Sequence, residues 1–339
     1  MSQKANQMWC LSKRPNQNID ASNFSWQETQ LPSTLGDGEV LVRTLYLSLD
    51  PTNRLWASDM DQYMPPVRLG DVMRGATLGV VEESNNARIP VDSIVSGMWG
   101  WQSYFQGGAG GLSLVDPVPD VPLSAYISIL GINGMTAFFG LFDVGQAKAS
   151  DSVVVSAAAG SVGSLVGQMA KIHGCRVVGI AGSDEKCRWL TEELGFDAAI
   201  NYKLSGWSAQ LSASCPDGVD LYFDNVGGEV TDVVIDQMNS HARIAVCGMI
   251  SRYNEAEPWS GPKNYGMVLM RSLTIRGFLV SDYFKRFSEG MRIVATWLSE
   301  GRLQYSVEIV EGLENAPQAI DRLFLGTNTG KLLVRCSPE

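Results

Sequence analysis

Short apolar runs alternate with helix-length segments through the middle of the chain. The apolar runs lie near residues 153–156, 176–180, 197–200, 219–223, 242–247 and 272–278. Helix-length segments separate the first five of these runs from one another. Strands that alternate with helices in this way build parallel sheets with helices on both faces. The pattern therefore predicts an α/β fold with a doubly wound parallel sheet.

The chain before the proline-rich passage Asp116–Pro122 follows a different pattern. It contains short β-like runs broken by Gly, Pro and Asp, at residues 39–47, 76–81 and 93–99. Closely spaced short strands with turn residues between them are typical of a compact, mostly β domain. The proline-rich passage marks the end of that domain, because proline continues neither helices nor central strands.

The C-terminal part of the chain returns to the β-like pattern. A helix is predicted near residues 283–299, and two further β runs follow at 305–310 and 331–336. Their alternation resembles that of the first region. We therefore expect a mostly β domain, a dinucleotide-binding domain and a C-terminal return to the first domain, at residues 1–123, 124–303 and 304–339, respectively.

A glycine-rich turn lies between the first apolar run of the middle region and the helix that follows. Residues Ala157–Gly163 hold two glycines three positions apart, Gly160 and Gly163, while alanine replaces the first glycine of the usual G-x-G-x-x-G motif. Glycines at a strand-to-helix turn let the backbone approach a pyrophosphate, and the helix N-terminus supplies N–H donors. A second apolar run at βαβ spacing follows. This context favours a dinucleotide site over an ordinary glycine-tolerant turn.

The end of the second apolar run indicates which dinucleotide binds. A cofactor without a 2′-phosphate usually meets a carboxylate there, but residues 181–183 are Ala-Gly-Ser, and Lys186 follows one turn later. A cation with a nearby hydroxyl suits a 2′-phosphate. Two alternatives stay open: Asp184 or Glu185 could turn inward, and Lys186 could be a solvated surface residue. The sequence favours NADP(H).

Composition excludes several classes of protein. The chain has 339 residues, of which 45% are hydrophobic and 18% charged, and a net charge of −10. This acidic balance argues against nonspecific nucleic-acid binding and offers no basic arm for an anionic membrane. The polar N-terminus has no signal-peptide apolar region, and the six scattered cysteines suggest reduced thiols. We expect a cytoplasmic protein with a small-molecule substrate and no nucleic-acid or membrane partner.

Several motifs together resemble those of the medium-chain dehydrogenase/reductase superfamily. Within it, the chain is similar to the zinc-independent, NADPH-dependent alkenal/one reductases, a group that includes prostaglandin reductases and bacterial curcumin reductases. The resemblance implies a GroES-like β domain, a Rossmann domain, NADPH as cofactor and a homodimer. The motifs that carry it lie at residues 46–51, 157–163, 181–187, 194–197, 201–203, 223–229, 243–251 and 311–318.

The same resemblance implies the residues that contact the cofactor. The pyrophosphate would bind at Gly160, Ser161, Val162 and Gly163, and the 2′-phosphate at Ser183, Lys186 and Tyr202. The loops after the fourth and fifth strands would contribute Asn225, Cys247, Gly248, Met249, Ile250, Ser251 and Tyr253. The nicotinamide would meet Thr136, Phe278, Leu279, Val280 and Asn328. Two alternatives remain, because Asn225 could be only a turn residue and Phe278 only core packing.

The implied reaction is hydride transfer to the β-carbon of an enone or enal. Negative charge then develops on the carbonyl oxygen, and a nearby donor stabilises it before the α-carbon is protonated. Tyr253 is the first candidate donor and Tyr63 the second. The ribose 2′-hydroxyl of the cofactor could serve instead, and either tyrosine could be only a pocket wall.

Two further features refine the expected site. Relatives commonly carry Tyr-Met where this chain has Thr52-Asn53, so we expect a wider or more hydrated acceptor site, which puts bulky curcumin-type enones in doubt. No metal is expected, because the only histidines, His173 and His241, neighbour no matching cysteine motif.

Other functions compete with an enone reductase. A quinone oxidoreductase is the main alternative, since it is a zinc-free relative with the same expected fold. An NADPH-binding protein without enzymatic activity is the third possibility, because one fold supports many functions.

Overall fold

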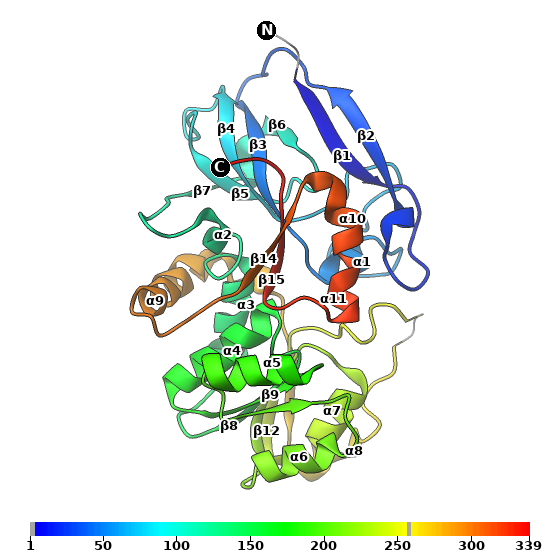
Figure 1. The fold of residues 1–339 in the computed structure, drawn as a ribbon, viewed down its shortest axis with the longest axis vertical. Coiled ribbons are helices and arrows are strands. Elements are labelled where there is room, and N and C mark those ends of the chain that lie inside the picture. The colour runs from blue at the N-terminus through cyan, green and yellow to red at the C-terminus, as the bar shows by residue number, and fades with distance from the viewer. Residues whose placement is uncertain (1–3, 256–258) are drawn as a thin grey trace. The chain divides into compact units, whose positions relative to one another are not determined.

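The computed structural model describes residues 4–255 and 259–339 of the chain. The described chain divides into two compact units (Figure 1). The first comprises the residues up to Ile127, Val307–Asn328 and Leu332–Glu339, and the second comprises Ser128–Ser306 and Thr329–Lys331. Residues 1–3 of the polar N-terminal segment, on which part of the signal-peptide argument rests, lie outside the described residues.

The second unit is built on a parallel sheet that has six strands within the described residues. Its order is β10-β9-β8-β11-β12-β13, so the direction of succession reverses between β8 and β11, as in a Rossmann fold. This confirms the predicted doubly wound sheet. The strands are β8 (Ser152–Val155), β9 (Arg176–Ala181), β10 (Ala198–Asn201), β11 (Val219–Asp224), β12 (Met238–Val246) and β13 (Thr274–Gly277).

The helices of this unit connect the strands. Helix α4 buries Leu165, Val166 and Met169 at helical spacing and ends at Gly174, whose φ of 94° is the left-handed conformation of a glycine cap. The predicted helix near 283–299 begins later, at Phe287, because Val280–Arg286 form a 3₁₀ helix. The helices are α3 (Ile132–Phe139), α4 (Ser161–His173), α5 (Asp184–Arg188), α6 (Trp207–Ser214), α7 (Gly228–Ile235), α8 (Gly266–Met270) and α9 (Phe287–Ser299), with π-helical turns at Gly140–Val144 and Trp189–Glu193.

The first unit is mostly β. Over the described ranges it contains a sheet in the order β14-β15-β3-β4-β5-β7, with β6 beside β3, and a separate pair, β1 and β2. Strand β15 pairs antiparallel with β3, so the C-terminal strands complete a sheet that begins near the N-terminus. The strands are β1 (Ala5–Leu11), β2 (Phe24–Gln30), β3 (Glu39–Ser48), β4 (Thr77–Ser84), β5 (Ile94–Gly97), β6 (Tyr104–Gly108), β7 (Ser113–Val115), β14 (Val307–Glu311) and β15 (Lys331–Arg335).

Short helices and a buried core fill the rest of the first unit. The core gathers residues from distant parts of the chain, such as Leu11, Trp101 and Ile320, each fully buried. This burial ties the C-terminal residues to the N-terminal sheet. The α-helices are α1 (Thr52–Trp56), α2 (Leu123–Tyr126), α10 (Ala316–Ala319) and α11 (Asp321–Leu325), and 3₁₀ turns lie at Ala21–Asn23, Ala109–Gly111 and Leu313–Asn315.

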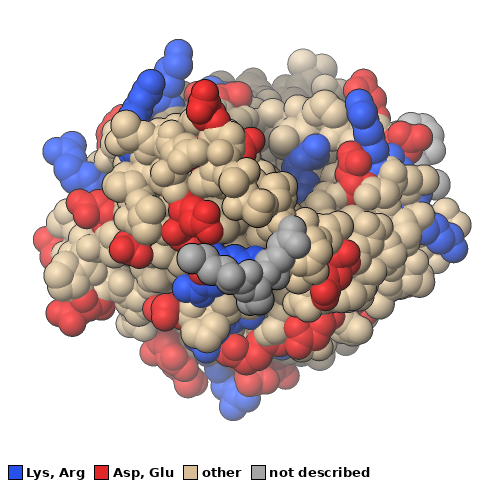
Figure 2. Space-filling view, turned by 90° about the horizontal axis from the view of Figure 1, so that it is seen from above, with Lys and Arg blue, Asp and Glu red and all other residues tan. Residues whose placement is uncertain are grey.

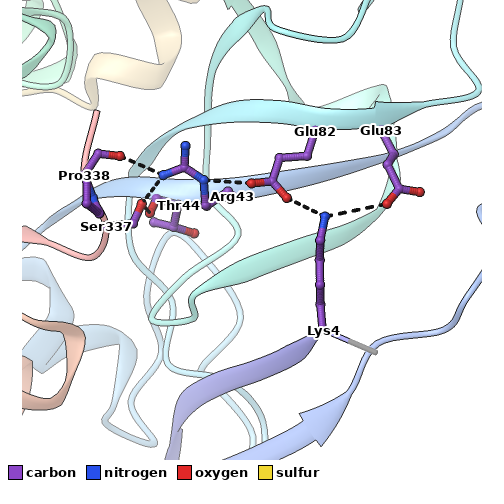
Figure 3. A network of polar contacts seen from close by, with 7 residues as sticks. All are labelled: Lys4, Arg43, Thr44, Glu82, Glu83, Ser337 and Pro338. Atoms are coloured by element: carbon purple, nitrogen blue, oxygen red, sulfur yellow. Dashed lines mark hydrogen bonds and ion pairs between the residues drawn. The ribbon is translucent and has the colours of Figure 1, made fainter. Parts of the chain in front are cut away.

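A polar network fixes both ends of the chain to β3 and β4 (Figure 3). Arg43 donates from Nε to Glu82 Oε1 at 2.8 Å, and from Nη1 to Ser337 Oγ and to the Pro338 carbonyl, both at 2.7 Å. Lys4 Nζ donates to Glu82 Oε2 at 2.6 Å. Glu82 therefore forms ion pairs with Lys4, near the N-terminus, and with Arg43, which in turn binds the C-terminal residues.

This network predicts a pH dependence of stability. Burial alone would raise the pKa of Glu82, but the hydrogen bonds from Lys4 and Arg43 outweigh it and hold that pKa below its ordinary value. A carboxylate whose pKa is depressed in the folded state stabilises the fold at pH values above its ordinary pKa. This contribution is lost as the pH falls through the depressed pKa. We expect Glu82→Gln to lower Tm by about 2 °C at neutral pH and the difference from wild type to shrink in acid. Calorimetric melting at several pH values checks this.

The neighbouring carboxylate supplies the control. Glu83 lies 3.6 Å from Lys4 Nζ and is more exposed than Glu82, so Glu83→Gln should change Tm little at any pH. A difference between Glu82→Gln and wild type that stayed constant from neutral pH into acid would contradict the prediction.

Charged side chains of both signs are scattered over the face shown in Figure 2, between larger areas of other residues. Lys and Arg are interspersed among Asp and Glu on that face, in keeping with the net charge of −10. Among the described residues, no helix combines the length and the apolar character that a bilayer crossing requires.

Candidate functional site

The predicted glycine-rich turn lies between β8 and α4. Gly160 caps the helix with an extended backbone, and the helix begins at Ser161. The first N–H groups of an α-helix have no partner within the helix, and together with the helix dipole they attract anions. The turn thus offers a phosphate-binding N-terminus on a 13-residue helix.

Steric contacts explain the residue at each position of the turn. A Cβ on Gly163 would lie 2.4 Å from the Ala157 carbonyl oxygen, so this position requires glycine. A Cβ on Gly160 would meet only that same oxygen, at 3.1 Å. Alanine fits at position 158 because its methyl group lies against Gly179 of β9. A Cβ added to Gly179 would come within 3.0 Å of that methyl group.

A C-terminal segment is hydrogen-bonded to this turn. The Gly330 N–H donates to the Ala159 carbonyl at 2.9 Å, and Gly160 and Gly330 form an isolated parallel bridge. Lys331 N in turn donates to the Ser306 carbonyl at 2.8 Å. Residues Thr329–Lys331 therefore complete the turn within the second unit.

The end of β9 carries the predicted 2′-phosphate residues. Ser183 caps α5, accepting a hydrogen bond from Lys186 N at 3.3 Å. Asp184 and Glu185 are exposed, and Asp184 accepts from Asn201 Nδ2 at 2.8 Å. Burial, followed by the charge of Lys203, lowers the pKa of Lys186. Asp184 thus pairs with the last residue of β10, Glu185 is exposed, and a partly buried lysine stands at this strand end.

Two residues from the neighbouring strand end join Lys186. Around Gly182, a Cβ would lie 3.4 Å from both Tyr202 Cε1 and Lys203 Cε, and 3.7 Å from Lys203 Nζ. Tyr202 was among the predicted residues, whereas Lys203 was missed. The signal was available, because Asn201-Tyr202-Lys203 follows β10, and adjacent parallel strands end on the same edge of a sheet.

The loops after β11 and β12 are tied to β8 and to each other. Asn225 donates from its backbone N to Ser156 Oγ at 2.9 Å and from Nδ2 to the Ser156 carbonyl at 2.7 Å. Ile250 N donates to the Asn225 carbonyl at 3.2 Å, and Ser251 N to the Val226 carbonyl at 3.1 Å. Asn225 therefore serves the geometry of its turn, whatever else it contacts.

Tyr253 closes the loop after β12. Its side chain is 9% exposed, and its hydroxyl oxygen accepts from Met249 N at 3.2 Å. The ring lies 5.8 Å from that of Trp259. In the same loop, burial and the charge of Asp224 raise the pKa of the Cys247 thiol to about 12, so Cys247 stays protonated at neutral pH.

The residues after β13 and on α3 are placed by packing. The Phe278 ring lies 6.4 Å from Phe223, and a Cβ on Gly140 would come within 2.6 Å of it, so the half-buried Phe278 packs against both residues. Leu279 is exposed, and Val280 begins the 3₁₀ helix. Thr136 donates its hydroxyl to the Ile132 carbonyl at 2.7 Å, within α3.

Tyr63 and Asn328 belong to the first unit, and their roles stay predictions. The Tyr63 hydroxyl accepts from Trp56 Nε1 at 3.0 Å. Asn53 is fully buried, accepts from Asp50 N at 2.8 Å and donates to the Arg74 carbonyl at 2.8 Å. Its amide is thus used inside the unit, and the expectation of a wider or more hydrated acceptor site stays a prediction.

Within residues 4–255 and 259–339, no three His, Cys, Asp or Glu side chains lie together as a metal site would require. All six cysteines fall in these ranges and are free thiols.

Comparisons with known proteins agree with this geometry. Two family models match: one described as the N-terminal domain of oxidoreductase, over residues 7–115, and one described as zinc-binding dehydrogenase, over residues 161–296. The chain is 42% identical to the NADPH-dependent curcumin reductase of Escherichia coli (strain K12), over 98% of both proteins. It is 40% identical to prostaglandin reductase 1 of Bos taurus, over 96% of this chain and 98% of that protein. The crystal structure of CurA from Vibrio vulnificus in complex with NADPH is similar with a TM-score of 0.93 and 40% identity, over 98% of this chain and 100% of that one.

Proposed function

Because the chain belongs to the medium-chain dehydrogenase/reductase family, we propose that it reduces the carbon–carbon double bond of α,β-unsaturated ketones and aldehydes with NADPH. The observation that carries this proposal is the cluster of Lys186, Tyr202 and Lys203 at the ends of β9 and β10. The Lys203 ammonium beside Gly182, with the Lys186 ammonium close enough for the two charges to interact, fits a 2′-phosphate, because a dianion needs cations and room.

The residues present fit the whole cofactor. The α4 N-terminus at Gly160–Gly163 would receive the pyrophosphate, and Ser183 would stand beside the 2′-phosphate. Asn225, the loop 247–253, Phe278–Val280, Thr136 and Asn328 are the proposed contacts of the nicotinamide half. Space beside Gly182, which a Cβ would fill, supports the adenosine end of this arrangement.

The chain's own task in the reaction is to stabilise charge on the acceptor. Bound NADPH supplies the hydride. Negative charge on the acceptor's carbonyl oxygen then requires a hydrogen-bond donor, for which Tyr253 is the first candidate and Tyr63 the second. Comparing kcat of Tyr253→Phe and Tyr63→Phe at saturating NADPH distinguishes them: a fall in one assigns the donor to that phenol. Full activity in both variants would assign the donor to the ribose 2′-hydroxyl of the cofactor.

The overall activity is tested by NADPH oxidation with an acceptor panel. An alkyl enone, an enal, a diaryl enone of the curcumin type and a benzoquinone are each assayed with NADPH and with NADH. We expect oxidation of NADPH by the enones and the enal, with a saturated carbonyl product. Turnover of the quinone alone would replace the proposal with a quinone oxidoreductase, and tight binding without any turnover would favour a non-enzymatic NADPH-binding protein.

We also propose a homodimer that forms along β13. This strand ends the sheet order, and all four of its residues are exposed. Ile275 of β13 and Leu269 of the preceding helix α8 are exposed apolar residues, the latter 78% exposed. An exposed strand edge with apolar neighbours favours pairing with a second copy. Light scattering should give a dimer that Ile275→Glu dissociates, and a monomeric wild type would refute this.

The free thiols support a cytoplasmic location.

A further inference from the structure

A buried carboxylate lies beneath the loops of the candidate NADPH site. Asp224 is the last residue of β11 and is 2% exposed. A buried carboxylate persists only where donors surround it. Its side chain accepts hydrogen bonds from five donors of the described chain: Tyr222 OH at 2.8 Å, Ser156 Oγ at 3.3 Å, Val226 N and Gly227 N at 2.9 Å each, and Thr231 Oγ1 at 2.6 Å.

The backbone of Asp224 extends this set of contacts. Its carbonyl accepts from Cys247 N at 2.8 Å and from Gly248 N at 3.1 Å, at the start of the loop after β12. Ser156, which directly precedes the glycine-rich turn, accepts from Asn225 N through the same hydroxyl that faces Asp224. One residue thus joins the loops that follow β8, β11 and β12.

The neighbours of Asp224 are held in a single protonation state. Burial, followed by the charge of Asp224, raises the pKa of Tyr222 well above its ordinary value, so its phenol stays a donor at neutral pH. Moving any of these loops would leave a buried donor or acceptor without its partner, which costs more than an ordinary hydrogen bond contributes.

We propose that Asp224 is a positioning residue of the NADPH site, whose carboxylate fixes the loops after β8 and β11 in the geometry that receives the nicotinamide half. The inference rests on the proposed function. In a Rossmann fold the two halves of a dinucleotide bind on opposite sides of the switch point, here between β8 and β11. Asp224 contacts the β11–β12 side and Ser156, whereas Lys186 and Tyr202 lie on the β9–β10 side. Loss of the Asp224 carboxylate should therefore weaken binding of the nicotinamide half more than binding of the adenosine half.

Binding of two ligands to Asp224→Asn tests this selectivity. Asparagine keeps one acceptor oxygen, and its NH₂ can donate to the Thr231 hydroxyl, so the shape is retained while the charge is lost. We expect the Kd for NADPH to rise roughly tenfold, while the Kd for 2′,5′-ADP, which lacks the nicotinamide half, changes less than about twofold. Titration calorimetry on the whole protein measures both, and the KM for NADPH should rise more than kcat falls.

Asp220, near the other end of β11, provides a matched control. Asp220 accepts from Ser152 N at 2.9 Å and from Asn239 Nδ2 at 2.8 Å. Asp220→Asn should lower Tm without changing either affinity. Should Asp224→Asn fail to fold, Ser156→Ala replaces it, because it removes the hydroxyl between Asp224 and Asn225, and the same selective loss is expected at smaller size.

The outcomes separate this inference from the function on which it rests. A wild-type protein that bound neither NADPH nor 2′,5′-ADP would refute the proposed function. A wild type that binds both, with Asp224→Asn weakening both ligands in parallel or neither, overturns the positioning role. A selective loss in Asp220→Asn as well would show only general damage to the sheet, and would overturn it too.

Discussion

Replacing Gly163 by alanine is expected to destabilise the second unit by about 3 kcal/mol, or roughly 10 °C in Tm, and to abolish tight NADPH binding. The new Cβ would lie 2.4 Å from the Ala157 carbonyl oxygen and 2.9 Å from Ala158 Cα. Both are backbone atoms, so no side-chain rotation relieves the contact. The turn between β8 and α4 must open, and it takes the helix N-terminus with it. Calorimetric melting and NADPH titration measure the two effects.

Gly160→Ala is the matched control. Its Cβ meets one atom at 3.1 Å, and the backbone φ of −82° is ordinary for alanine. We expect Tm to stay within about 2 °C of wild type while NADPH binding weakens, because the methyl group stands where the backbone must approach the pyrophosphate. A Gly163→Ala protein that melted with wild-type Tm would show that the turn is not the rigid feature described here.

Replacing Lys186 by alanine is expected to raise the Kd for NADPH by about 10–100-fold and to leave that for NADH unchanged. A hydrogen bond to a charged group contributes about 1.5–3 kcal/mol, which corresponds to this range. Because burial and Lys203 lower the pKa of Lys186, a dianionic phosphate between the two lysines would relieve their repulsion. Fluorescence titration with both dinucleotides measures the ratio.

Lys171→Ala controls for the loss of a lysine as such. Lys171 lies on α4 and pairs at 2.9 Å with Asp197, which directly precedes β10. This pair lies away from the carboxyl ends of β9 and β10, where Lys186 and Lys203 are. Lys171→Ala should leave the preference for NADPH over NADH intact. If Lys186→Ala also kept that preference, the 2′-phosphate assignment would be wrong, and Lys203 would be the next residue to test.

The strands, the turn and the position of Lys186 could be predicted because each depends on local sequence. Valine runs between helix-length segments specify β8 and β9, and glycine spacing specifies the turn after them. Lys203 was missed for a different reason. It approaches Lys186 only because β10 pairs beside β9, with Asn201 opposite Ala181, and strand order is not written in any one segment.

The buried carboxylate escaped prediction for the same physical reason. The donors to Asp224 come from β8, β11 and α7, so the site exists only after these elements have packed. One local sign was present, since a carboxylate directly after Leu221-Tyr222-Phe223 stands at the end of a buried strand, where charge is costly.

The Gly330–Ala159 hydrogen bond has a consequence for how the protein matures in the cell. Domains generally start to fold as the chain leaves the ribosome. The continuous stretch Ser128–Ser306 is synthesised well before Thr329–Lys331, which belong to the same unit. A nascent chain halted after residue 306 can therefore assemble its sheet while its glycine turn still lacks the hydrogen bond from Gly330. We expect such a stalled chain to bind NADPH weakly, so that capture of the cofactor becomes one of the last events of biosynthesis.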